Sequence, residues 1–169
     1  GKIAEGAVNS TPISGVDYLP TVCEIAGIDV PDDRTIDGTS IWPVLRGGAF
    51  KRKNPLYWFF YRLLPAVAMR EGDWVLISNT TDAGRPKTHS LVAADMPRIK
   101  DSELKDFELY NLRSDRRQQT DLSTAEPTVL ARLKKRMTEF HQNVVREGPV
   151  WDIPEDYAKG KGARLWHSR

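Results

Sequence analysis

The chain has 169 residues, of which 40% are hydrophobic and 28% are charged. These values are typical of a soluble globular protein with one modest domain, or one domain and part of another. The formal net charge of +2 argues against nucleic acid or a membrane surface as a partner, because such partners need concentrated cationic charge. No apolar run approaches the ~20 residues of a membrane-spanning helix. The single cysteine, Cys23, excludes an intrachain disulfide.

The first fifty residues predict one helix followed by turns. Asp17 can cap this helix, Pro20 is compatible with its first turn, and Gly27 can end it in the left-handed conformation. A spacing of three and four residues predicts one buried apolar face. That face consists of Leu19, Val22, Cys23 and Ala26. Further on, the basic residues Arg46, Lys51, Arg52 and Lys53, together with Gly47 and Gly48, are typical of an exposed connector.

From residue 55 the pattern changes to strands, because aromatic and β-branched residues become frequent. The expected strands cover 56–61, 66–70, 74–78 and 107–112. The turn residues Glu71, Gly72 and Asp73 predict a hairpin between the second and third of them. The polar segment 79–106 is too long for a plain connector, so we interpret it as an insertion with a short strand near 90–92.

The longest predicted helix spans about 126–146, with Ser123 or Thr124 as its cap, Pro127 in its first turn and Gly148 at its end. Apolar residues recur along it with a helical period. They are Val129, Leu130, Leu133, Met137, Phe140, Val144 and Val145. The whole pattern predicts an α+β fold, in which this helix packs on a small antiparallel sheet of about four strands.

Residues that could carry chemistry are sparse. The three histidines lie far apart in the sequence and match no metal-ligand spacing, so His141, beside Phe140, is interpreted as an ordinary histidine on a helix face. The acidic residues between 29 and 37 fail the spacing of an EF-hand loop and are better explained as turn and cap residues. The residues alone therefore predict no catalytic residue and no metal site in this chain.

A series of short motifs nevertheless runs from residue 1 to about residue 122. In chain order they are Gly1-Lys2-Ile3, Pro12-Ile13-Ser14-x-x-Asp17-x-x-Pro20-Thr21, Ala26-Gly27-Ile28, Asp37-Gly38-x-Ser40-x-x-Pro43-x-Leu45-x-Gly47, Leu56-Tyr57-Trp58, Ala68-Met69-Arg70-x-Gly72-Asp73-Trp74-x-Leu76-Ile77 and Glu108-Leu109-Tyr110-Asn111-Leu112-x-x-Asp115. Their order and spacing resemble the C-terminal part of a formylglycine-dependent sulfatase, a family of the alkaline-phosphatase-like superfamily that includes arylsulfatases and glycan sulfatases.

The resemblance implies three segments. Residues 1–54 would be the C-terminal end of a larger α/β catalytic domain, 55–148 the antiparallel-sheet subdomain with its helix, and 149–169 a tail. In this chain alone, the helix at 17–26 should then expose apolar surface that the rest of its domain would cover in the complete protein. The expected partners are the N-terminal catalytic domain of the same protein and a sulfated substrate, expected to be a glycan.

The resemblance also implies which chemistry lies elsewhere. Sulfatases hydrolyse sulfate esters with a formylglycine made from Cys or Ser in a Cys/Ser-x-Pro-x-Arg motif. Neither the proline nor the arginine of this motif follows Cys23. Ser10 is followed by Pro12 at the proline position, but Ser14 stands at the arginine position. The family's calcium ligands and formylglycine precede the segment that this chain matches. We therefore expect the chain by itself to be inactive and to hold no cofactor, and we expect the protein to be exported or lysosomal.

Two residues are candidates for substrate binding. In the family, the loop after the Tyr-Trp strand approaches the mouth of the active site, and here that loop contains Tyr61 and Arg62. A tyrosine ring can stack on a sugar, and an arginine offers paired donors to a sulfate.

Two alternatives to a sulfatase stay open. One is another alkaline-phosphatase-like hydrolase, acting on phosphonates or phosphodiesters, since that group shares the Asp-x-x-Pro-Thr helix. The other is a carbohydrate-binding module, suggested by the aromatic run 57–61, although strand alternation would turn about half of those rings into the core.

Overall fold

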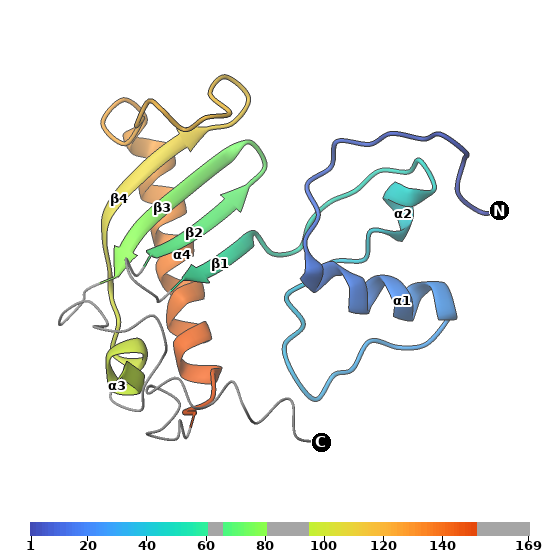
Figure 1. The fold of residues 1–169 in the computed structure, drawn as a ribbon, viewed down its shortest axis with the longest axis horizontal. Helices are drawn as coiled ribbons and strands as arrows, with labels where there is room; N and C mark the ends of the chain where they lie inside the picture. The colour runs from blue at the N-terminus through green and yellow to red at the C-terminus, as the bar shows by residue number, and fades with distance from the viewer. Residues whose placement is uncertain (61–65, 81–94, 152–169) are drawn as a thin grey trace, which may run out of the picture. The chain divides into compact units, whose positions relative to one another are not determined.

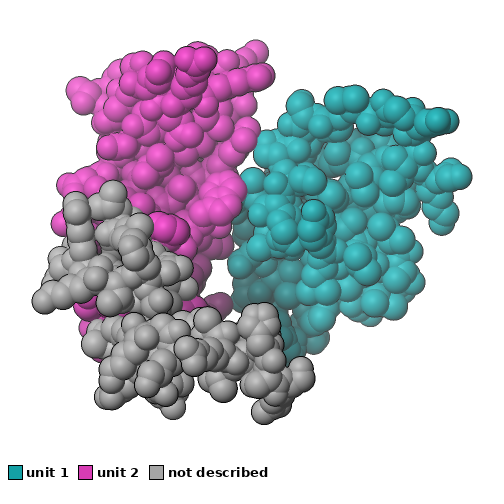
Figure 2. Space-filling view, viewed as in Figure 1, with its two compact units in different colours: residues 1–56 teal, residues 57–169 magenta. Residues whose placement is uncertain are grey.

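The computed structural model describes residues 1–60, 66–80 and 95–151 (Figure 1). The chain divides into two compact units, Gly1–Leu56 and Tyr57–Arg169, which Figure 2 shows in different colours. Within the described residues, no helix is both long enough and apolar enough to cross a bilayer.

Unit 1 contains one regular α-helix and two shorter helical segments. A 3-10 turn at Gly15–Asp17 leads into α1 (Tyr18–Ala26), and α2 (Trp42–Leu45) follows later. The predicted end of α1 is confirmed, because Gly27 has a φ of +68° and its N–H bonds to carbonyl groups of the last turn. Only glycine adopts this conformation without strain.

Unit 2 contains the sheet. Its strands are β1 (Leu56–Phe60), β2 (Ala66–Glu71), β3 (Trp74–Thr80) and β4 (Leu104–Asn111), in the spatial order β1-β2-β3-β4. β2 pairs antiparallel with β3, and β3 with β4, which brings Met69, Leu76 and Leu109 side by side across the sheet. The predicted hairpin at 71–73 is confirmed, with Gly72 at a φ of +61°.

One long helix, α4 (Pro127–Glu147), packs on one face of this sheet, as Figure 1 shows. The side chains that form the core come from β2, β3, β4 and α4. They are Val67, Met69, Leu76, Leu109, Leu133 and Met137. The predicted α+β fold, with a four-stranded antiparallel sheet and a long C-terminal helix, is confirmed. The assignment of residues 1–54, 55–148 and 149–169 to three segments stays a prediction.

Three details differ from the sequence prediction. A short helix, α3 (Asp95–Lys100), and the start of β4 at Leu104 both lie inside the segment that was interpreted as an insertion. The N-cap of α4 is Glu126 and neither Ser123 nor Thr124. The helix α3 escapes sequence analysis because its six residues are too few to show a hydrophobic period. The strand expected near 90–92 lies outside the described residues.

Candidate functional site

A buried carboxylate organises unit 1. Asp17 is fully buried, and Arg52 bonds both of its oxygens, Nη1 to Oδ1 at 2.7 Å and Nη2 to Oδ2 at 2.8 Å. The backbone N–H groups of Ser14 and Thr39 also donate to it, at 2.8 and 3.0 Å. Burial by itself would raise the pKa of Asp17, but the hydrogen bonds from Arg52, Thr39 and Ser14 outweigh it and lower the pKa below its usual value.

The same network extends into the neighbouring turns. The Thr21 hydroxyl donates to the carbonyl of Asp17 at 2.6 Å and accepts the N–H of Ile41 at 3.0 Å. Gly38 is required sterically, because a Cβ at that position would lie 1.9 Å from the carbonyl oxygen of Val16. The Asp-x-x-Pro-Thr and Asp-Gly motifs are therefore structural in this unit.

The network corrects one prediction about the basic segment near residue 50. Arg52 was expected in an exposed connector, yet only 15% of its side chain is exposed. Besides Asp17 it bonds the carbonyl of Pro12 at 2.9 Å. Its partners are 35 and 40 residues away in the sequence, which is why a local charge pattern could not identify them.

The outer face of α1 is apolar and exposed. Tyr18, Val22 and Ile25 follow one another at a helical spacing and are 63%, 59% and 52% exposed. The predicted exposed apolar surface on this helix is thus confirmed. The predicted buried face is wrong for Leu19, Val22 and Ala26, since only Cys23 of those four is buried, together with Pro20 and Thr21. A helix with apolar residues on nearly every side is typical of a helix that is enclosed in its complete protein.

The candidate substrate-binding residues, Tyr61 and Arg62, lie outside the described residues, and their role stays a prediction. Cys23 is within them and is a buried free thiol in α1. Across residues 1–60, 66–80 and 95–151, no group of three or more His, Cys, Asp or Glu side chains is arranged to hold a metal ion.

A second buried polar site lies in unit 2, around His141 of α4. The histidine is 1% exposed, and it contacts Tyr57 of β1 and Ser102, which follows α3. His141 thus lies on a face of α4, as predicted, and the structure adds that this is the buried face. The apolar stripe of α4 contains Met137 and Val145, one turn before and after position 141, and this spacing was the available signal that His141 faces the core.

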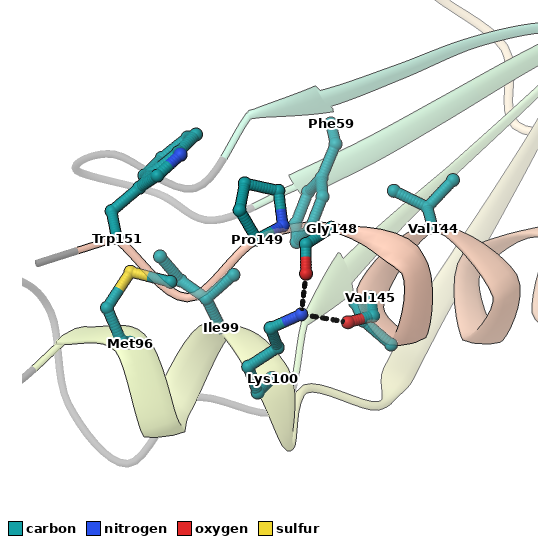
Figure 3. A pocket seen from close by; sticks show the side chains of 9 residues that line it. All are labelled: Phe59, Met96, Ile99, Lys100, Val144, Val145, Gly148, Pro149 and Trp151. Carbon is teal, nitrogen blue, oxygen red and sulfur yellow. Dashed lines mark hydrogen bonds between the residues drawn. The ribbon is translucent and has the colours of Figure 1, made fainter. Parts of the chain in front are cut away.

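An apolar cavity of about 160 Å³ lies at the C-terminal end of α4 (Figure 3). The residues that line it come from β1, α3, α4 and the chain after α4. They are Phe59, Met96, Ile99, Lys100, Val144, Val145, Gly148, Pro149 and Trp151. The Lys100 ammonium donates to the carbonyl oxygens of Val145 and Gly148, so it caps the end of α4. Because the amine of Lys100 is engaged by these carbonyl groups and the other lining residues are apolar, the cavity supplies mainly hydrophobic contact.

Comparison with known proteins places this chain among sulfatases. It is 36% identical to steryl-sulfatase of Mus musculus over 75 residues, which are 44% of this chain and 12% of that protein. It is 32% identical to a sulfatase of Formosa agariphila over 133 residues, and 31% identical to choline-sulfatase of Rhizobium meliloti over 126 residues. These alignments cover 76% and 72% of this chain, and 22% of each relative. No protein-family model matches the chain.

A solved structure shares the fold. The crystal structure of Ps i-CgsB superposes with a TM-score of 0.60 at 20% identity, over 94% of this chain and 30% of that one. The same protein has been crystallised in complex with k-i-k-neocarrahexaose. The chain therefore spans 12% to 22% of the three relatives named above and 30% of this solved structure. The sequence relatives and the motif order together lead to one conclusion: the chain belongs to the sulfatase family and corresponds to a C-terminal part of it.

Proposed function

We propose that this chain is the C-terminal part of an enzyme that hydrolyses sulfate esters, and that it supports the catalytic domain without supplying the nucleophile. The similarity to sulfatases supports the reaction. The supporting role rests on the exposed apolar stripe of α1, on a helix held by the buried Asp17–Arg52 pair. An exposed apolar patch on a helix whose position is fixed by buried contacts is typical of a surface that binds another protein or domain.

The reaction centre is proposed to lie in the rest of the enzyme. There a formylglycine would act as the nucleophile and a calcium ion would stabilise the sulfate charge, with ligands from the preceding domain. We expect such an enzyme to be exported from the cytoplasm or to reside in a lysosome.

The docking partner of α1 is the N-terminal catalytic domain of the same protein. Burial of one exposed Val or Ile side chain is worth about 1.5–3 kcal/mol, so Val22 and Ile25 together would contribute substantially to holding the two parts in one fold. Within residues 1–56, the face of α1 that carries Pro20, Thr21 and Cys23 is already buried, which leaves the opposite face for the partner.

Val22→Asp tests this docking in two contexts. In the 169-residue chain the substitution changes an exposed position, so the thermal midpoint should change little. In the full-length enzyme it buries a charge at the interface, and both the thermal midpoint and the hydrolysis of an aryl sulfate should fall sharply. Val8→Asp is the matched control, because Val8 is 96% exposed and lies outside α1. Equal behaviour of the two variants in the full-length enzyme would contradict docking through α1.

Tyr61 and Arg62 are proposed to form one wall of the substrate cleft. Arg62 stays cationic at neutral pH and presents a planar set of donors to an anionic glycan, while Tyr61 would stack on a sugar ring. In the full-length enzyme, Arg62→Ala should raise KM for a sulfated oligosaccharide and leave KM for a small aryl sulfate nearly unchanged. Equal losses on both substrates would indicate damage to the fold and remove Arg62 from the site.

One observation favours the carbohydrate-binding alternative as a second function. Trp58 and Phe60 alternate with the core-facing Tyr57 and Phe59, and they remain 46% and 55% exposed on the other face of β1. Two exposed rings at a spacing of two residues can stack on a glycan. Trp58→Ala should then abolish binding of the chain to a glycan array. The phosphonate or phosphodiester alternative is tested by assaying the full-length enzyme on matched aryl sulfate, phosphonate and phosphodiester substrates.

A further inference from the structure

The buried histidine of α4 connects three elements that are distant in the sequence. Tyr57 of β1 lies 84 residues before His141, and its hydroxyl is 2.8 Å from Nδ1. On the other side of the ring, Nε2 lies 3.0 Å from the carbonyl oxygen and 3.1 Å from the hydroxyl of Ser102. Both ring nitrogens therefore have partners, and the three residues form a continuous chain of hydrogen bonds.

These partners determine where the proton of the ring lies. A carbonyl oxygen can only accept, so Nε2 must carry a hydrogen and donate it to Ser102. The Ser102 hydroxyl does not compete as a donor, because it donates to the carbonyl of Ile99 at 2.7 Å. Nδ1 is consequently the unprotonated nitrogen, and it accepts the hydrogen of the Tyr57 hydroxyl. With the ring neutral, each donor and acceptor in this series of hydrogen bonds has a partner.

A second proton on the ring would break this arrangement. Nδ1 would become a donor that faces the Tyr57 hydroxyl, and the hydroxyl hydrogen would have to turn away from its acceptor. Burial also opposes the charged ring and lowers the pKa of His141, although the bond to the Ser102 carbonyl partly offsets this.

Among the described residues, no carboxylate is bonded to the ring to compensate its charge. The residues one turn away on α4, namely Met137, Thr138, Val144 and Val145, are uncharged. Of the titratable groups on neighbouring elements, Tyr57 bonds the ring and Lys100 bonds carbonyl groups at the end of α4. Asp95 pairs with Arg98. Asp101 and Glu103, on either side of Ser102, are exposed.

β1 is an edge strand that carries one member of this hydrogen-bond chain, Tyr57. It stands at one end of the strand order, as β4 does at the other, so its outer side has no strand partner among the described residues. It is also fastened to α4 through ring contacts, Tyr57 with Phe140 at 4.8 Å and Phe59 with His141 at 5.1 Å between centroids. We propose that the Tyr57–His141–Ser102 chain is a pH-sensitive latch, in which neutral His141 holds β1 on α4 and protonation releases the strand. This proposal does not depend on the proposed function.

Hydrogen exchange of the 169-residue chain between pH 7.5 and 5.0 tests the latch. After correction for the intrinsic exchange rate, the opening equilibrium constant of the β1 amides should rise as the pH falls below about 6.5, by at most tenfold per pH unit for one proton. The amides of β3 and β4 should change much less. Asp17, Asp115 and Asp121 have pKa values below the usual 3.8, so these three carboxylates add no dependence over this range. Opening of β1 that is independent of pH would overturn the proposal.

Two variants separate the latch from general destabilisation. In His141→Gln the amide can donate to Ser102 and accept from Tyr57 without titrating, so the pH dependence of β1 should disappear. Tyr110→Phe, which removes a hydroxyl bonded to Glu108 at 2.8 Å on the same sheet, should retain it. If His141→Gln does not fold, nitrogen NMR of the unmodified chain decides. The latch requires the Nε2–H tautomer and a His141 pKa below 6.5, and a pKa at or above 6.5 would overturn it.

Discussion

The two compact units bury their apolar residues to very different extents. Among the described residues, ten of the fourteen exposed large hydrophobic side chains belong to residues 1–56, including the whole outer stripe of α1. The described residues of unit 2 include only four: Trp58, Phe60, Val150 and Trp151. Its core, in contrast, joins three strands and a helix through fully buried side chains.

The difference indicates two ways of holding a fold together. Unit 2 gains its stability from hydrophobic burial, as a self-sufficient domain does. Unit 1 instead relies on the buried ion pair of Asp17 and Arg52, in which each carboxylate oxygen also accepts a backbone N–H. A buried pair of this kind specifies a geometry more than it adds stability. Unit 1 is therefore organised by polar contacts and left with an apolar surface for a partner.

Asp17→Ala should break unit 1 and leave unit 2 folded. It would leave Arg52 without its carboxylate and two backbone N–H groups without an acceptor, at a cost of about 3–5 kcal/mol. Hydrogen exchange measured separately for the two units would show loss of protection only in residues 1–56. The control Asp33→Ala removes only an exposed pair with Arg34 and should change nothing measurable. Cooperative loss of both units would contradict their independence.

Leu133→Ala compares the same residue type in the two units. Leu133 is 1% exposed in the core of unit 2, so its truncation should cost about 3 kcal/mol through lost burial and a cavity. Leu19→Ala in α1 removes a side chain that is 47% exposed and should cost far less in the 169-residue chain. Urea denaturation, followed by signals from each unit, measures both changes. Similar losses would mean that unit 1 has a core of its own.

Acid should destabilise unit 1 at pH values well below the range in which His141 is expected to gain a proton. Because the folded pKa of Asp17 is lowered from 3.8, its contribution is present above that value and is lost as the pH falls through the folded pKa. Each unit of displacement corresponds to about 1.4 kcal/mol. Fluorine NMR of the chain labelled with 5-fluorotryptophan can follow this, since Trp42 is the only tryptophan in residues 1–56. A Trp42 transition between pH 7 and 5 would contradict the assignment.

Glu71→Gln should have the smallest effect. Glu71 of β2 pairs with Arg132 and Arg136 of α4, but both arginine side chains are 42–52% exposed. Solvent screens such pairs, so the loss should be about 0.5 kcal/mol and should shrink further in 1 M salt. Urea midpoints at low and high salt provide the measurement. A loss that is large and insensitive to salt would make this ion cluster part of the core of unit 2.

Local patterns predicted the elements that are long or carry a sharp turn signal. The seven apolar positions of α4, the hairpin at Gly72 and the end of α1 at Gly27 could all be located without coordinates. The buried face of α1 could not, because apolar residues occur on almost every side of that helix. Periodicity identifies a core only when the opposite face is polar.

The fold class, the order of the motifs and the family could be predicted without coordinates, since each depends on residues near one another or on their order along the chain. The roles of Arg52 and His141 became visible in the folded chain. Arg52 meets Asp17 across 35 residues, and His141 meets Tyr57 across 84. The chemistry of a charged or titratable side chain depends on which groups surround it and on how much water reaches it. Both are properties of the folded chain and not of the neighbouring sequence.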